Sequence, residues 1–112
     1  MHELSLCENM LSLLEESAQQ EQFSQVLVIH LLVGELSCVE PEALLFCFDA
    51  IKNNTLAETA QLVIENVPGR AQCQACAIEL KVHSFAECCS ACGGILDVVA
   101  GDQIQIKFLE VC

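Results

Sequence analysis

The sequence predicts an α+β fold, in which two helices cover a small three-stranded sheet and a cysteine-rich module is inserted. Three observations lead to this prediction. Two segments carry apolar residues at helical spacing, three segments have the apolar pattern of strands, and four cysteines form two matched pairs. The expected order is helix, strand, helix, strand, cysteine module and strand. The module therefore interrupts a sheet that the last strand completes.

The first helix is expected over residues 5–20. Ser5 and Glu8 have the spacing of a capping box, in which the serine caps the start of the helix and the glutamate bonds back to it. Met1 to Glu3 would then lie just before the helix. Apolar residues at intervals of three and four positions give this helix one buried face: Cys7, Met10, Leu11, Leu14 and Ala18.

The next two elements are a strand and a second helix. The nearly continuous apolar run from Val26 to Val33, ended by Gly34, predicts a strand that is buried on both faces and central in the sheet. Pro41 predicts the start of the second helix, because the first turn of a helix does not need the missing N–H. The inward-facing side chains are expected to be Leu44, Leu45, Phe48 and Ile51.

Two more strands flank the cysteine module. Residues 61–67 predict the second strand, which Pro68 and Gly69 end. Residues 103–108 alternate strictly between polar and apolar side chains and predict a third strand with one solvent-exposed face. We therefore expect one domain formed by residues 1–69 and 97–112, and an inserted domain formed by residues 70–96.

The composition excludes several classes of protein. Apolar residues make up 54% of the 112 residues, which is enough for a packed core and too much for a disordered regulator. No apolar run reaches the roughly 20 residues that a membrane-spanning helix needs, so no membrane insertion is expected. The chain begins without the basic and apolar regions of a signal peptide, which predicts a cytoplasmic protein.

The charge balance indicates the kind of partner. Sixteen acidic residues against four basic ones give a formal net charge of −12. Such a surface repels phosphate backbones, so we expect no binding to nucleic acid. It is suited to cations and to basic protein partners.

The two cysteine pairs have the spacing of a metal site. Cys73 and Cys76 are separated by two residues, as are Cys89 and Cys92, and twelve residues lie between the pairs. Each pair places two thiolates on one tight turn, and four thiolates without an open position are typical of structural zinc. The alternating segment 78–82 predicts a short strand between the pairs, as in a zinc ribbon. A module of this size cannot bury a core unaided, so bound metal would supply folding free energy.

Other interpretations of the cysteines remain open. One pair could be a redox dithiol, and iron could replace zinc, since a four-sulfur site accepts both ions. Cys88, next to a predicted ligand, is interpreted as a bystander. Cys7, Cys38 and Cys47 are expected to be small core residues, and Cys112 an exposed terminal thiol.

The N-terminus could form a second metal site. The α-amine, the backbone nitrogen of His2 and its imidazole can close fused chelate rings on one ion, with the backbone nitrogen of Glu3 as fourth donor. Deprotonated amide nitrogen favours square-planar Ni(II) or Cu(II). A histidine near a terminus is more often solvated and inert. His30 is expected in or at the edge of the core, and His83 is either solvated or close to the zinc site.

Four features of the sequence, in this order, resemble the HypA/HybF family. They are the segments Met1–Cys7, Gly34–Glu40 and Phe46–Asp49 and the two cysteine pairs. The similarity runs in register over essentially the whole chain. Ser90 stands where members of the family often have a proline, and Cys88 is an additional thiol.

The resemblance implies a function in nickel delivery. The family consists of hydrogenase maturation factors, which are nickel metallochaperones that help to insert nickel into the large subunit of [NiFe]-hydrogenase. They work with a HypB-type GTPase, and in some organisms they also serve urease. The resemblance places the transported nickel on Met1, His2 and Glu3 of an α/β domain. It places structural zinc on Cys73, Cys76, Cys89 and Cys92 of a separate ribbon. A homodimer is an open alternative.

Functions of other classes compete with this one. A zinc-ribbon adaptor would bind a protein and carry no labile metal, and a rubredoxin-like protein would carry electrons on iron. An enzyme is disfavoured, because the sequence has no array of nucleophile and base and no phosphate-binding loop. A closed site of four cysteines also leaves no position for a substrate.

Overall fold

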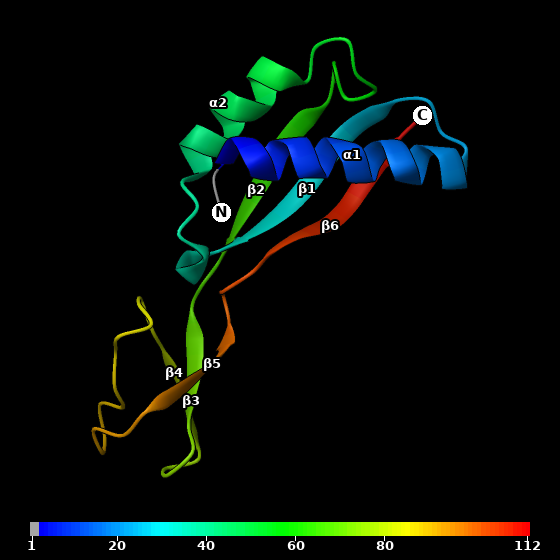
Figure 1. Ribbon diagram of the computed structural model, residues 1–112. Coiled ribbons are helices and arrows are strands. Elements are labelled where there is room, and N and C mark those ends of the chain that lie inside the picture. The colour runs from blue at the N-terminus through cyan, green and yellow to red at the C-terminus, as the bar shows by residue number, and fades with distance from the viewer. Residues whose placement is uncertain (1–2) are drawn as a thin grey trace. The chain divides into compact units, whose positions relative to one another are not determined.

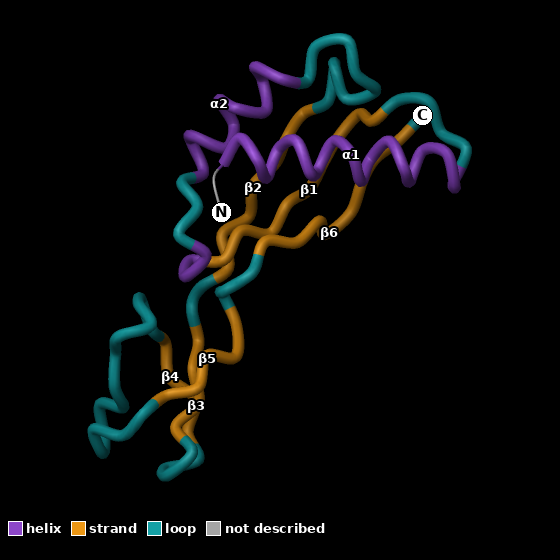
Figure 2. The backbone as a smooth tube through the Cα atoms, in the orientation of Figure 1, coloured by secondary structure: helices purple, strands orange, loops and turns teal. Residues whose placement is uncertain are grey.

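The computed structural model describes residues 3–112 (Figure 1). Its elements in chain order are α1 (Glu3–Glu21), β1 (Val26–Gly34), the 3₁₀ helix η1 (Glu35–Ser37), α2 (Pro41–Ile51), β2 (Gln61–Val67), β3 (Arg70–Cys73), β4 (Ile78–Lys81), β5 (Leu96–Ala100) and β6 (Ile104–Val111). The strands form two sheets of three strands each, which Figure 2 shows in orange. The predicted α+β class is confirmed, with two helices, a three-stranded sheet and an inserted cysteine module.

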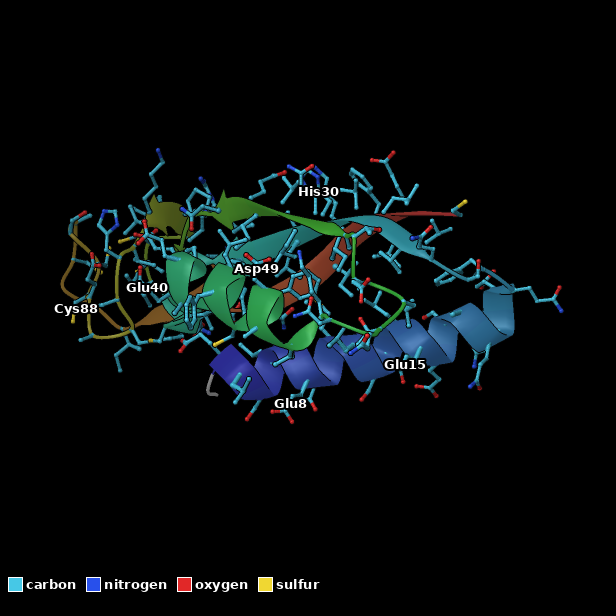
Figure 3. All side chains as sticks on the ribbon, turned by 90° about the horizontal axis from the view of Figure 1, so that it is seen from above. Glu8, Glu15, His30, Glu40, Asp49 and Cys88 are labelled. Carbon is cyan, nitrogen blue, oxygen red and sulfur yellow. The ribbon has the colours of Figure 1, made fainter. Side chains whose placement is uncertain are left out.

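The first sheet has the strand order β2-β1-β6, so β1 is central as predicted. Backbone hydrogen bonds between Cys112 and Gln25 at one end and between Gly34 and Gln103 at the other make β1 and β6 antiparallel. Helices α1 and α2 lie on one face of this sheet, and His30 projects from the other (Figure 3). The largest fully buried side chains of this layer are Leu14, Val26, Ile29, Val33, Leu44 and Phe48.

The helices differ from the prediction in two respects. The structure places Ser5 inside α1, which already includes Glu3, so the predicted capping box is wrong. Leucine and glutamate are good helix formers, and a glutamate in the first turn is favoured by the helix dipole. Leu45 is exposed, because it lies about 100° around α2 from the buried Leu44. The predicted apolar face of α1 is confirmed for Cys7, Met10, Leu11 and Leu14.

The strands also required correction. The prediction that β1 is buried on both faces is wrong, because the helices cover one face only and Val28, His30 and Leu32 are half-buried. β6 is an edge strand in which Phe108 is exposed, and its ring centroid lies 4.6 Å from that of His30. β6 is also longer than predicted, since its pairing with β1 continues to the C-terminus.

The second sheet has the order β4-β3-β5 and is antiparallel throughout. The alternating segment was correctly predicted as β4, whereas β3 and β5 were not predicted. In the register of this sheet, Cys73 pairs with Ile78 on one side and with Leu96 on the other. A small core supports the sheet: Leu36, Ala71 and Val82, with Leu96 and Val98 packed against them.

The chain divides into two compact units. Unit 1 comprises residues 1–31, 39–64 and 106–112, and unit 2 comprises residues 32–38 and 65–105. Residues 32–38 belong to unit 2 because Leu36 packs in the core of the second sheet. The division into a domain of residues 1–69 and 97–112 and a ribbon of residues 70–96 remains a prediction. Within the described part of the chain, neither helix has the length and hydropathy of a membrane span.

Close contact between backbone segments organises unit 2. The amide of Leu36 donates to the carbonyl of Gly101 at 2.7 Å, and the amide of Val82 donates to the carbonyl of Gly69 at 3.0 Å. A Cβ on Gly34 would lie 2.2 Å from the Gly101 carbonyl oxygen. Only a residue without a side chain permits this approach. The glycines therefore hold the start of η1 against the turn between β5 and β6.

Candidate metal centre

Four thiols converge at one end of the second sheet. Cys73 ends β3 and Cys76 lies in the turn that leads to β4, while Cys89 and Cys92 lie in the loop that leads to β5. All four Sγ atoms lie within 4.8 Å of one another. The Sγ atoms of Cys73 and Cys92 are 3.6 Å apart. Four sulfurs at about 2.3 Å from a tetrahedral zinc ion would be about 3.8 Å apart, so the observed spacing fits this ion.

The two cysteine pairs form matched turns. The amide of Ala77 donates to the carbonyl of Cys73 at 2.8 Å, and the amide of Gly93 donates to the carbonyl of Cys89 at 2.7 Å. Ala77 and Gly93 each follow the second cysteine of a pair, and both have positive φ, 56° and 73°. This left-handed residue reverses the chain so that two thiols of one turn face the same point. The local sequence alone therefore builds both halves of the site.

Backbone N–H groups are directed at the sulfur atoms. The amide of Cys76 donates to Cys73 Sγ and the amide of Gly94 donates to Cys92 Sγ, both at 3.4 Å. Such bonds orient thiolate ligands and stabilise their negative charge. A Cβ on Gly94 would lie 3.2 Å from Cys92 Sγ, which is closer than an ordinary contact. Gly94 therefore has a specific steric role, because a side chain at this position would crowd the sulfur of Cys92.

The thiols of the cluster differ in acidity. Backbone N–H groups of Cys92 and Ala91 lower the pKa of Cys89 to about 7. Hydrogen bonds with the thiols of Cys92 and Cys73 raise the pKa of Cys76 to about 12. A thiolate therefore forms more easily at Cys89 than at Cys76, from which an incoming metal ion must displace the proton.

The remaining cysteines lie outside this cluster. Cys88 is exposed and its backbone pairs with Ile95, and its interpretation as a bystander stays a prediction. Cys7 is buried as predicted, and burial, then Cys47, then Glu3 raise the pKa of its thiol to about 11. The prediction that Cys38 is a core residue is wrong, because Cys38 is exposed with a positive φ after η1. Cys112 is exposed as predicted.

The predicted nickel site is only partly described. Met1 and His2 lie outside the described residues, so their predicted function stays a prediction. Glu3 begins α1 and is half-buried. Its Oε2 accepts a hydrogen bond from the amide of Glu40 at 3.5 Å. The first turn of α1 therefore lies beside the first turn of α2, and Figure 3 labels Glu40 at that position.

A contact that the sequence did not predict involves His83. Its Nδ1 lies 2.6 Å from Oε2 of Glu35, 48 positions earlier in the chain. The other carboxylate oxygen, Oε1, accepts the amide of Gly69 at 3.0 Å. His83 therefore belongs to an ion pair of unit 2, and no signal in the sequence indicated this pairing.

An open pocket of about 430 Å³ lies in unit 2. Its lining includes apolar residues of three strands, such as Leu32, Val67 and Val98. Asp102 is the one ionisable side chain among the residues that line it.

The chain is similar to a known protein family in both sequence and fold. A family profile described as "Hydrogenase/urease nickel incorporation, metallochaperone, hypA" matches residues 1–111. The chain is 46% identical to the hydrogenase maturation factor HypA of Rhodopseudomonas palustris and 44% identical to that of Geobacter sulfurreducens, over 99% of each chain. The solution structure of the Ni metallochaperone HypA from Helicobacter pylori superposes with a TM-score of 0.75. That match has 22% identity and covers 99% of this chain and 97% of the other, so it concerns the fold.

Proposed function

Because the chain belongs to the HypA family of nickel-incorporation metallochaperones, we propose that it binds Ni(II) at its N-terminus and delivers it during maturation of [NiFe]-hydrogenase. The observation that carries the proposal is the match over residues 1–111, which includes the Met1-His2-Glu3 start. The family resemblance noted in the sequence is thereby confirmed, and it supports the proposed function in nickel delivery.

The proposed nickel site uses nitrogen donors of the first residues. Terminal amines and imidazoles in general titrate near neutrality, so groups of these kinds can lose a proton to bind metal. Backbone nitrogens of His2 and Glu3 would complete a square-planar set. A site of this kind has no enclosing cage, so nickel can leave by stepwise exchange with the ligands of an acceptor.

The four-cysteine centre has a structural function in this proposal. Four thiolates fill a tetrahedral shell and leave no position for a substrate or for exchange. The core of the second sheet is small, so the metal contributes to its folding free energy. In this proposal the four cysteines hold the two turns of the ribbon in place, and nickel binds at the N-terminus.

The partners and location follow from the same proposal. We propose that the chain works with a HypB-type GTPase and with the large subunit of the hydrogenase. An excess of acidic residues would suit a partner with a basic surface. We place the handover in the cytoplasm, where a reducing environment keeps free thiols and zinc thiolates intact. The proposed activity is metal handover without catalysis.

A nickel titration tests the proposal. Untagged, zinc-loaded protein is titrated with Ni(II) by calorimetry and visible absorption, beside a variant with one additional N-terminal residue and beside His2→Ala. We expect tight binding and a square-planar spectrum for the native terminus, and loss of both in the two variants. His83→Ala is the matched control, because it also removes an imidazole but leaves the N-terminal donors unchanged.

Two outcomes would contradict the proposal. Equal nickel binding by the native protein and the extended variant would move the nickel to other donors. Absence of specific binding would instead favour the alternative of a zinc-ribbon adaptor that binds protein and carries no labile metal.

A further inference from the structure

Two cysteines of unit 1 lie at the contact between α1 and α2, outside the four-cysteine centre. Cys7 on α1 is fully buried, and Cys47 on α2 is half-buried. Both are free thiols. The four-cysteine centre belongs to unit 2, so neither it nor the proposed nickel site uses this pair.

Hydrogen bonds between the helices place the two thiols near each other. The thiol of Cys7 donates to the carbonyl oxygen of Leu44 at 3.5 Å. One turn earlier along both helices, the carboxylate of Glu3 accepts the amide of Glu40. Both contacts join residues that are 37 positions apart, so α1 and α2 advance together turn by turn along their contact (Figure 1).

Cys47 lies on the turn of α2 that follows Leu44. A helix carbonyl points toward the next turn, and Cβ atoms three positions apart in a helix are about 5–6 Å from each other. The Cys7 sulfur, which contacts the Leu44 carbonyl, is therefore next to Cys47. The electrostatics agree with this placement, because burial raises the pKa of Cys7 to about 11 and Cys47 makes the next largest contribution.

The two thiols differ in their access to solvent. Cys47 is half-buried between the exposed Phe46 and the buried Phe48, whereas Cys7 has no exposed surface. A reagent that arrives from solvent therefore reaches Cys47 first. Cys7 is shielded from the reagent, but the packed helices present it to Cys47 at a high effective concentration.

The other thiols outside the four-cysteine centre lie elsewhere. Cys38 and Cys88 belong to unit 2. Cys112 follows β6, and its amide bonds to the backbone beyond the C-terminal end of α1. Cys7 lies near the other end of this helix, about 21 Å away along the helix axis. Within the described part of unit 1, Cys47 is therefore the thiol that Cys7 can reach.

We propose that Cys7 and Cys47 form a redox-sensitive thiol pair that reacts with a small-molecule disulfide of the glutathione type. The Cys47 sulfur attacks this disulfide and forms a mixed disulfide, and one molecule of the small thiol leaves. The Cys7 sulfur then attacks the sulfur of Cys47 and displaces the second small thiol, which takes up the proton of Cys7. Two protein thiols are oxidised to one disulfide, and one small-molecule disulfide is reduced to two thiols.

The bridge would hold the first turns of α1 against α2. Cys7 is one turn after Glu3, so the bridge fixes the part of the helix that follows the proposed nickel donors. An excess of the small thiol reverses the reaction, as expected for a disulfide that forms transiently in a reducing compartment. This inference goes beyond the nickel function and does not depend on it.

Oxidation of zinc-loaded, nickel-free protein tests the inference. Reduced protein is incubated with an excess of oxidised glutathione, free thiols are blocked, and a protease that cuts after glutamate is applied. Cys7, Cys38 and Cys47 then fall in three separate peptides, which are residues 4–8, 36–42 and 43–58. We expect mass spectrometry to show the first and third peptides linked. The melting temperature should rise by about 10 °C, because the bridge constrains the unfolded chain, and dithiothreitol should reverse both effects.

Three variants sharpen the test. Cys47→Ser should abolish the linked peptides and the rise in melting temperature, and it should leave Cys7 unmodified. Cys7→Ala should stop the reaction at glutathione bound to Cys47. Cys38→Ser changes an exposed thiol of unit 2 and is the matched control, which should react like the native protein. Cys47 is half-buried, so its serine variant should fold, and this variant decides the test if Cys7→Ala does not fold.

The outcomes separate this inference from the proposed function. Oxidised native protein in which Cys7 and Cys47 stay unlinked, or in which Cys47 is linked to Cys38, would overturn the thiol pair. A rise in melting temperature that persists in Cys47→Ser would also overturn it. Nickel titration of the reduced native protein is read separately, so a failure of the proposed nickel site leaves the result for the thiol pair unchanged.

Discussion

The Nδ1 atom of His83 lies 2.6 Å from Oε2 of Glu35 and joins the loop after β4 to η1. The hydrogen bond with Glu35 raises the pKa of His83, and its charge adds to the effect. The amide of Gly69, followed by His83, lowers the pKa of Glu35. Glu87 and Lys81 also act on the imidazole, in opposite directions. The pair thus holds both of its members in their charged forms.

The first prediction is that this pair stabilises the protein most in mildly acidic solution. The contribution of His83 is complete below its ordinary pKa of 6.5 and is lost as the pH rises through its raised value in the folded state. The contribution of Glu35 is complete above its ordinary pKa of 4.5 and is lost as the pH falls through its lowered value. His83→Gln should therefore lower the melting temperature most between these two pH values, and progressively less as the pH rises through the raised pKa of His83.

A double-mutant cycle checks that the effect arises from the pair. Adding Glu35→Gln to His83→Gln should cost less than the sum of the single changes at about pH 5.5. Strict additivity of the two changes at that pH would show that the groups do not interact.

The second prediction concerns the four cluster thiols as zinc ligands and is measured by alkylation with mass spectrometry. In zinc-loaded protein, the exposed thiols of Cys38, Cys88 and Cys112 should react fast. The four cluster thiols should resist until a chelator removes the metal. Cys7 should resist until the protein unfolds, because burial raises its pKa to about 11. Protection of Cys88 by zinc would identify it as a ligand and refute its interpretation as a bystander.

The third prediction is that Ala77→Gly stabilises the zinc-loaded protein. Ala77 has a φ of 56°, a conformation that an L side chain rarely adopts and that the equivalent Gly93 adopts without strain. The substitution should raise the free energy of unfolding by about 1 kcal/mol, measured by denaturant titration. Ala91→Gly, at an ordinary φ in the other turn, is the control and should give no gain. A loss of stability in Ala77→Gly would show that the backbone relaxes around the alanine.

The fourth prediction is that Gly34→Ala severely destabilises the protein. Gly34 has an ordinary φ of −70°, so the cost comes from its close approach to the carbonyl of Gly101. Because that neighbour is backbone and cannot rotate away, we expect a loss of about 3 kcal/mol or more. Gly93→Ala provides the contrast, since its Cβ would meet open space and only the positive φ opposes it. Equal small losses in both variants would contradict the steric argument.

The cluster of four thiols was predictable from sequence because each half of it is local. Two cysteines on one turn are placed by the backbone angles of a few consecutive residues, and Ala77 and Gly93 supply the required conformation within the same turn. The apolar face of α1 was predictable for a similar reason, since residues three and four positions apart share a face of any α-helix.

Other features depended on contacts between distant residues. Strand β3 directly follows Pro68 and Gly69, which were interpreted as the end of a strand, and it forms by pairing with β4 and β5. Leu45 and Phe46 are as apolar as the buried residues of α2, and only the position of the sheet decides which of them is covered. The contact of Glu3 with Glu40 likewise joins helices whose mutual position no local pattern encodes.

The amino-acid sequence by itself determined the two helices and three strands of the first layer, the two cysteine pairs, the acidic composition and membership of the HypA family. These properties depend on residue type and on spacing within one element or one turn. Only the tertiary structure decided that His83 pairs with Glu35, that Gly34 faces Gly101, and that Phe46 faces solvent. Each of these depends on which segments, far apart in the chain, are brought together or left apart by burial of the same apolar core.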